Sequence, residues 1–206
     1  MSSSSDAKNH SVPESNTVTR RSFLVGAGVA AIGATWWWSL SRQPISAEAA
    51  GAGAPKMVTI IGFKDDGTRT TKESVARVVK SEEEWRKQLS PAAFEVARRA
   101  GTERPHSSDL LNVHDKGVFR CICCDNALFD SSTKFESGTG WPSFYQPIAK
   151  ENIVESVDLS LGMTRTAVSC RLCDAHLGHV FDDGPKPTGL RYCMNGVAMR
   201  FAKASA

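Results

Sequence analysis

The stretches Cys121-Ile122-Cys123-Cys124 and Cys170-Arg171-Leu172-Cys173 decide how this chain folds. Each contains a Cys-x-x-Cys pair, and a turn with that spacing places two thiolates on one side of a metal ion. Two such turns complete the tetrahedral shell of a structural zinc site. Because 45 residues separate Cys124 from Cys170, one zinc ion per chain would join two distant hairpins and stabilise the core.

Other ligand sets are open at this point. Cys123 lies inside the first pair and could replace a neighbouring ligand. His176 and His179 could join the second pair in a Cys/His site. Two disulfides or thioredoxin-like redox motifs are further interpretations, but neither pair sits in a βαβ pattern, which disfavours the redox one. The prediction that we keep is a zinc site formed by Cys121, Cys124, Cys170 and Cys173.

The composition is that of one globular domain with appendages. The chain has 206 residues, of which 41% are hydrophobic and 23% charged. Its formal net charge is only +3, and the basic residues form no run. The sequence therefore predicts no nucleic-acid partner.

Residues 1–49 read as a disordered N-terminus with an export signal. Arg20-Arg21 precedes an uncharged, Gly/Ala-rich segment over residues 23–40, and Ala47-Glu48-Ala49 offers the small residues of a cleavage site. This arrangement resembles a twin-arginine signal and predicts export to the periplasm or cell envelope. If the segment is not cleaved, it provides the only expected membrane contact.

The remaining chain divides into two parts. Residues 50–80 form a linker and N-terminal extension, with a short strand over residues 57–63 and a turn at Asp65-Asp66-Gly67. Residues 81–206 form the main domain. It opens with two short helices, one capped by Ser81 and the next starting at Pro91 and ending at Gly101.

From Gly117 onward the chain consists of short segments that alternate or are rich in β-branched residues. The expected strands cover residues 118–121, 153–159, 165–170 and 192–201. The fold class is therefore mainly β, or α+β, with an antiparallel core behind the two helices.

Cys193 is the one cysteine that neither belongs to a Cys-x-x-Cys pair nor, like Cys123, lies inside one. In isolation it reads as a buried core thiol. Arg191 and Asn195 lie two residues to either side, so all three share one face of a strand, where the arginine favours a thiolate. His176 and His179 supply imidazoles that could protonate a leaving oxygen.

With these residues, the chain resembles the B-type methionine sulfoxide reductases over about residues 81–202. The matching stretches are Gly101-Thr102-Glu103-Arg104-Pro105, the turn around Cys121 and Cys124, Lys134–Phe144 except position 139, Cys170-x-x-Cys173 and the residues from there to Phe181, Asp183-Gly184-Pro185, Pro187-Thr188-Gly189 and Arg191-Tyr192-Cys193-x-Asn195. So many matches in order are far more specific than any single motif. The resemblance implies two small antiparallel sheets in a tent-like arrangement, with zinc on the side opposite the active site.

The resemblance also implies an activity, the reduction of peptide-bound methionine (R)-sulfoxide. Cys193 would be the nucleophile that becomes a sulfenic acid, assisted by Arg191. His176, His179 and Asn195 would orient and protonate the sulfoxide oxygen. Trp141 and Phe181 would bind the substrate. The implied partners are oxidised proteins and a thioredoxin-like or other thiol reductant.

One departure from the family pattern concerns the recycling step. Many relatives carry a resolving cysteine where this chain has Thr139, so the sulfenic acid would be reduced by an external thiol. Cys123 is the only other spare cysteine, and we expect it to be a spectator.

Two alternatives to a reductase remain for the function of the protein. One is a zinc-stabilised binding module of the same fold without catalysis, and the other is a zinc-handling envelope protein.

Overall fold

The structure, a computed structural model, describes residues 56–205. The export signal predicted over residues 1–49 lies outside this range. Among the described residues, no helix is long and apolar enough to cross a membrane.

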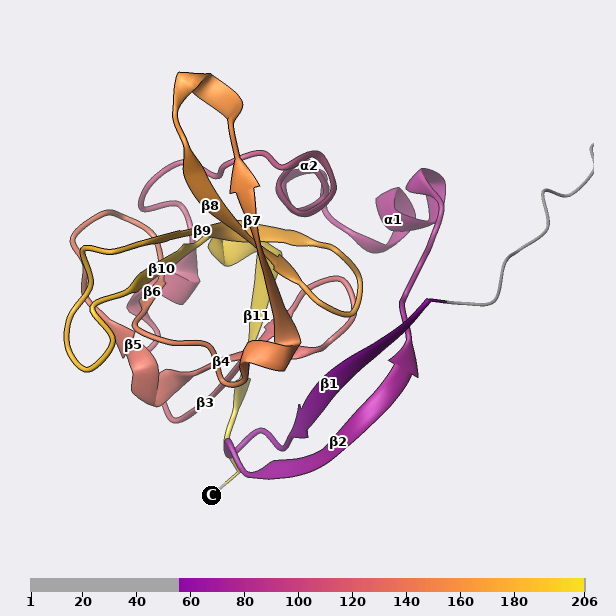
Figure 1. Ribbon diagram of the computed structural model, residues 1–206, viewed down its shortest axis with the longest axis horizontal. Helices are drawn as coiled ribbons and strands as arrows, with labels where there is room; N and C mark the ends of the chain where they lie inside the picture. The colour runs from indigo at the N-terminus through magenta and orange to yellow at the C-terminus, as the bar shows by residue number, and fades with distance from the viewer. Residues whose placement is uncertain (1–55, 206) are drawn as a thin grey trace, which may run out of the picture. The chain divides into compact units, whose positions relative to one another are not determined.

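Two short helices open the main domain (Figure 1). Helix α1 (Glu82–Gln88) begins with the predicted capping box, in which Ser81 and Glu84 satisfy each other's backbone N–H groups. Helix α2 (Pro91–Arg99) has proline in its first turn and ends at Ala100, which adopts a left-handed conformation with φ of 53° one residue before the expected Gly101. Its buried apolar residues lie on the side that packs against strand β9 (His176–Phe181) and the helical turn η5 (Gly196–Ala198).

The largest sheet has six antiparallel strands in the order β5-β6-β10-β9-β8-β7. They are β5 (Lys134–Phe135), β6 (Ser143–Phe144), β7 (Ile153–Asp158), β8 (Arg165–Cys170), β9 (His176–Phe181) and β10 (Arg191–Met194). A second sheet has the order β11-β3-β4, formed by β3 (Gly117–Cys121), β4 (Ala127–Asp130) and β11 (Met199–Lys203). These two sheets and two helices confirm the mainly-β class.

Aromatic side chains join the two sheets in the core. Phe129 of β4 stacks on Phe144 of β6 with ring centroids 4.4 Å apart, and Phe119 of β3 meets Phe144 edge-on at 4.9 Å. All three rings are fully buried, so their burial is a main source of the domain's stability.

Short helical turns lie between the helices and strands. They are η1 (Asp109–Asn112), η2 (Ser131–Thr133), η3 (Lys150–Asn152), η4 (Ser160–Gly162) and η5 (Gly196–Ala198).

A third sheet precedes the main domain. The predicted strand β1 (Met57–Phe63) pairs antiparallel with β2 (Arg69–Ala76), which the sequence did not predict because its side chains are almost all polar and exposed. We call this pair the N-terminal hairpin. It lies beside the two larger sheets in Figure 1.

One predicted strand is wrong as a single element. The segment 192–201 is divided into β10 and β11 by the turn η5. The carboxylate of Glu103 accepts hydrogen bonds from the backbone N–H groups of Gly196 and Val197 at 2.6 and 3.0 Å. Because those groups are held by a distant side chain, they are not free to continue a ladder, and the chain crosses to the other sheet.

Candidate active site and metal centre

The sulfur atoms of Cys121, Cys124, Cys170 and Cys173 form a cluster in which every pair lies within 4.8 Å. We call residues 121–124 the first knuckle and residues 170–173 the second. The Sγ atoms of Cys121 and Cys173 are 3.6 Å apart, and those of Cys124 and Cys170 are 3.5 Å apart. A tetrahedral site with Zn–S bonds of about 2.3 Å has edges of roughly 3.8 Å, so the cluster fits such an ion.

The electrostatics of the cluster also suit a cation. Hydrogen bonds with Cys121 and Cys123 lower the pKa of Cys173, whereas hydrogen bonds with Cys123 and Cys124 raise the pKa of Cys121. Four thiolates this close repel one another unless a metal lies between them. Neither Cys123 nor the two histidines belong to the cluster, and the six cysteines are free thiols, which favours the four-cysteine set.

Cys193 lies in the middle of β10, half-buried, with a strand on each side. It pairs with His179 of β9 and with Ser143 of β6. Directly opposed residues on neighbouring strands share one face of the sheet, so the thiol and the imidazole are neighbours. A Cβ atom added to Gly178 would collide with the carbonyl oxygen of Cys193, so glycine is needed for β9 to approach β10 here.

A pocket of about 150 Å³ opens on this face and includes the Cys193 thiol. Its lining residues are Thr102, Trp141, Arg165, Gly178, His179, Phe181, Cys193 and Asn195. The structure therefore brings five of the predicted site residues into one pocket. None of the four zinc-site cysteines lines it.

Arg191 lies beside this pocket and is held in place by two contacts. Its guanidinium makes two hydrogen bonds of 2.8 Å to the carboxylate of Asp183 and lies 4.4 Å from the centre of the Phe181 ring. The hydrogen bonds to Asp183, followed by attraction to Cys193, raise the pKa of Arg191. Arg191 is therefore a permanent cation next to the thiol.

The two histidines reach the same face because β9 is irregular. Residues three apart point to opposite faces of a regular strand. Here the register with β8 shifts: Gly178 pairs with Val168, whereas His176 pairs with Ser169. The extra residue turns the two imidazoles toward each other, with ring centroids 5.3 Å apart.

The two imidazoles differ in their surroundings. Nε2 of His179 lies 2.7 Å from Oδ2 of Asp158, which also accepts a hydrogen bond from Arg165 at 2.8 Å. Hydrogen bonds with Ser160 and then with His179 lower the pKa of Asp158, so it is ionised. His176 is buried, its Nε2 has no hydrogen-bond partner among the described residues, and burial followed by repulsion from His179 lowers its pKa to about 4.

Asn195 and Trp141 are both positioned by Glu103. The Oδ1 atom of Asn195 accepts a hydrogen bond of 2.9 Å from the backbone N–H of Glu103, and its Nδ2 donates one of 3.0 Å to the carbonyl oxygen of Leu177. The indole N–H of Trp141 donates to the backbone carbonyl oxygen of Glu103 at 3.2 Å. One amide hydrogen of Asn195 therefore remains for a ligand in the pocket.

Sequence reasoning did not assign roles to Asp158, Arg165 or Glu103. Glu103 belongs to a stretch that matches the family pattern, but its hydrogen bonds to residues 196 and 197 span the whole domain. Asp158 and Arg165 face each other across β7 and β8. No local pattern connects Asp158 with His179, which is 21 residues away.

A larger cavity of about 560 Å³ adjoins the pocket and shares Thr102, Arg165 and His179 with it. The ends of α2 and β7 and the residues that follow them, which include Ala100 and Leu159, supply much of its remaining wall. Leu159 is 71% exposed. The Cys193 thiol thus lies in a small pocket that continues into a larger, partly apolar cavity.

Comparison with known proteins matches residues 89–203 of this chain to the SelR domain. The chain belongs to the SelR domain family. It is 51% identical over 128 residues to a protein of Hahella chejuensis named peptide methionine sulfoxide reductase MsrB, an alignment that covers 62% of this chain and 92% of that protein.

Two further relatives have similar names. The MsrB of Pseudomonas entomophila is 56% identical over 123 residues, which are 60% of this chain and 94% of that protein. Peptide methionine sulfoxide reductase B1, chloroplastic, of Arabidopsis thaliana is 54% identical over 121 residues, covering 58% of this chain and 59% of that protein.

Proposed function

We propose that this protein is a peptide-methionine (R)-S-oxide reductase in which Cys193 is the nucleophile. The observation that carries the proposal is the pocket in which a half-buried thiol, two aromatic side chains and the hydrogen-bonding side chains of His179 and Asn195 converge. Membership of the SelR domain family and relatives named MsrB support the same reaction.

In the reaction, the Cys193 thiolate attacks the sulfur of the sulfoxide. The oxygen is transferred to the cysteine with one proton, so the thiolate is oxidised by two electrons to a sulfenic acid and methionine leaves. Arg191 places a positive charge beside the attacking sulfur. The step is slow unless the oxygen is protonated as it leaves, so an acid must lie beside the thiol.

His179 and Asn195 are the groups that line the pocket and can reach that oxygen. Asp158 holds the His179 ring in place, in the way a carboxylate orients a catalytic imidazole. His176 lies behind His179, and because its imidazole is neutral, its role is to relay a proton or orient its neighbour.

The two aromatic residues give the pocket its apolar side. Trp141 and Phe181 lie where they can pack against the methyl group and methylene chain of the substrate. The adjoining cavity provides room for the polypeptide on either side of the oxidised residue. This arrangement supports methionine sulfoxide within a peptide as the substrate, rather than the free amino acid.

Recycling of the enzyme requires a partner. The Oγ1 atom of Thr139 lies 3.8 Å from Sγ of Cys193, where a resolving cysteine would have to lie. A hydroxyl cannot form a disulfide, so two equivalents of an external thiol reduce the sulfenic acid and release water. Cys123 packs against the metal cluster and is a spectator.

The four clustered cysteines would hold one structural zinc ion. Zinc bound by four thiolates has no open coordination position, so it stabilises the fold and takes no part in the chemistry. We expect the Cys173→Ser variant to lose its zinc and much of its stability, as measured by metal analysis and thermal unfolding. Full zinc content in that variant would refute the ligand set.

We also propose that the protein is exported to the periplasm or cell envelope. The support is the sequence of residues 20–49, with paired arginines ahead of an apolar segment and a cleavage site. Sequencing the N-terminus of the mature protein tests this. An intact Met1 on a soluble protein would contradict it.

Turnover of epimer-resolved dabsyl-methionine sulfoxide with a small dithiol is the test of the activity. The R epimer should be reduced and the S epimer should not, and the Cys193→Ser variant should be inactive while it retains its zinc. A binding module without catalysis would instead leave both epimers unchanged and Cys193 unreactive toward iodoacetamide near neutral pH.

A further inference from the structure

The N-terminal hairpin has no role in the chemistry of the Cys193 pocket. Its strands end at Ala76, whereas the match to the SelR domain begins at residue 89. An isolated two-stranded hairpin is marginally stable in water. The hairpin must therefore be stabilised by its contacts with the main domain. Three of these contacts reach residues around the metal centre.

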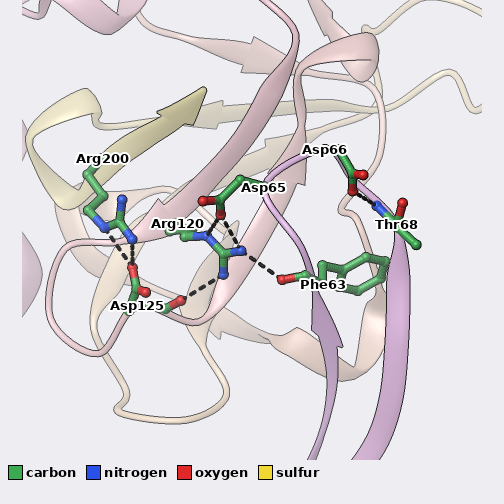
Figure 2. Close-up of polar contacts among 7 residues, drawn as sticks. All are labelled: Phe63, Asp65, Asp66, Thr68, Arg120, Asp125 and Arg200. Atoms are coloured by element: carbon green, nitrogen blue, oxygen red, sulfur yellow. Dashed lines mark hydrogen bonds and ion pairs between the residues drawn. The ribbon is translucent and has the colours of Figure 1, made fainter. Parts of the chain in front are cut away.

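The first contact reaches the first knuckle through Arg120, which is 9% exposed. Its guanidinium donates hydrogen bonds to Asp65 Oδ1 at 2.7 and 2.9 Å and to the carbonyl oxygen of Phe63 at 2.7 Å. The same group donates to the carbonyl oxygen of Asp125, the residue after Cys124, at 3.2 Å. Figure 2 shows the guanidinium between Phe63 and Asp65 of the hairpin and Asp125, which follows the knuckle.

The second contact reaches the second knuckle from the other end of the hairpin. The backbone N–H of Val78 donates to the carbonyl oxygen of Leu172, inside the knuckle, at 2.8 Å. Arg77 forms an ion pair with Asp174, the residue after Cys173. Asp125 and Asp174 both have positive φ, 65° and 57°, so each hairpin contact meets the left-handed turn that closes a knuckle.

A third contact joins the middle of the hairpin to a metal ligand. The buried side chain of Asn152 exchanges hydrogen bonds with the backbone N–H and carbonyl oxygen of Ile61 at 2.7 and 2.8 Å. The carbonyl oxygen of Asn152 accepts from Nδ2 of Asn126, which also donates to Sγ of Cys170 at 3.5 Å. The hairpin is thus linked to both knuckles and, through Asn152 and Asn126, to the sulfur of Cys170.

We propose that the N-terminal hairpin is a clamp that holds the two knuckles together and slows the loss of zinc. The proposal rests on the four-cysteine zinc site. Zinc is released when one knuckle moves away and two thiolates leave together, and that movement must break the hairpin's contacts with the turn behind it. Arg120 and Arg77 are therefore positioning residues for the metal centre.

The test measures the rate at which zinc passes from the full-length protein to the chromogenic chelator 4-(2-pyridylazo)resorcinol without denaturant. We expect release at least tenfold faster in Arg77→Gln and Arg120→Gln. Arg120→Lys keeps the charge but loses the guanidinium that donates to three acceptors, so its rate of zinc release should be intermediate. The charge-matched control is Lys87→Gln, which breaks only an exposed pair with Glu83 on α1 and should release zinc at the wild-type rate.

A second control separates the clamp from general destabilisation. Leu110→Ala removes a partly buried side chain at η1 that takes no part in the hairpin contacts, and should lower stability without changing zinc release. The clamp is wrong if zinc-loaded Arg77→Gln and Arg120→Gln release zinc at the wild-type rate, or if Leu110→Ala accelerates release as much as they do. If Arg120→Gln does not fold, zinc release from Arg77→Gln, compared with both controls, decides whether the clamp is right. Wild-type protein that binds no zinc would instead overturn the metal assignment, and the clamp with it.

Discussion

Replacement of Asn152 by alanine should destabilise the domain strongly, because it removes three buried hydrogen bonds at once. The side chain is fully buried. It accepts a hydrogen bond from the N–H of Ile61 and donates to the carbonyl oxygens of Ile61 and Ala127, at 2.7, 2.8 and 2.8 Å. These bonds attach the N-terminal hairpin and β4 to the turn η3.

The magnitude follows from those three bonds. A buried hydrogen bond contributes about 1 kcal/mol net, and a buried backbone group left without a partner costs about 1–3 kcal/mol. We therefore expect Asn152→Ala to lower the free energy of unfolding by about 3 kcal/mol. In a domain of this size, that loss corresponds to a fall in Tm of roughly 6–12 °C.

Urea unfolding of the zinc-saturated protein, followed by tryptophan fluorescence, measures this loss. The matched control is Asn112→Ala, in which the replaced side chain is exposed, and its stability should remain within about 0.5 kcal/mol of the wild type. A loss below about 1 kcal/mol in Asn152→Ala would refute the view that these bonds hold the hairpin in place.

Three further predictions concern the pocket. In Thr139→Cys, a single turnover without reductant should yield a disulfide with Cys193, because the side chains at these two positions are already 3.8 Å apart. The wild type and the control Thr139→Ser should instead yield a sulfenic acid that dimedone can trap, and mass spectrometry distinguishes the two products. Asp158→Asn should lower kcat at least about tenfold while zinc content is unchanged, since His179 loses its charged partner, and an unaltered kcat would remove Asp158 from the mechanism. The pKa of His176 is lowered to about 4, so between about pH 6.5 and 4 the unfolded chain binds a proton that the folded chain does not, and the free energy of unfolding falls as the pH falls. Urea unfolding across that range should show a shallower decline in His176→Gln, and equal slopes in the two proteins would contradict this.

The sequence alone determined the parts that depend on local spacing. The two Cys-x-x-Cys turns predict the four-cysteine cluster because each turn holds two thiols together wherever it lies in the fold. The alternation of a strand places Arg191 and Cys193 on one face, and the capping box at Ser81 marks the start of α1. These relations involve residues no more than a few positions apart, so they can be predicted without knowing how the chain folds.

Only the tertiary structure decided the relations that span long segments. The bulge in β9 turns His176 toward His179, and strand pairing brings Asp158 to His179 from 21 residues away. The hairpin contacts are more distant still, since Arg120 and Asp65 are 55 residues apart. Such pairs form because sheet register and core packing bring their backbones together, and no local pattern in the sequence records which strand will lie beside which.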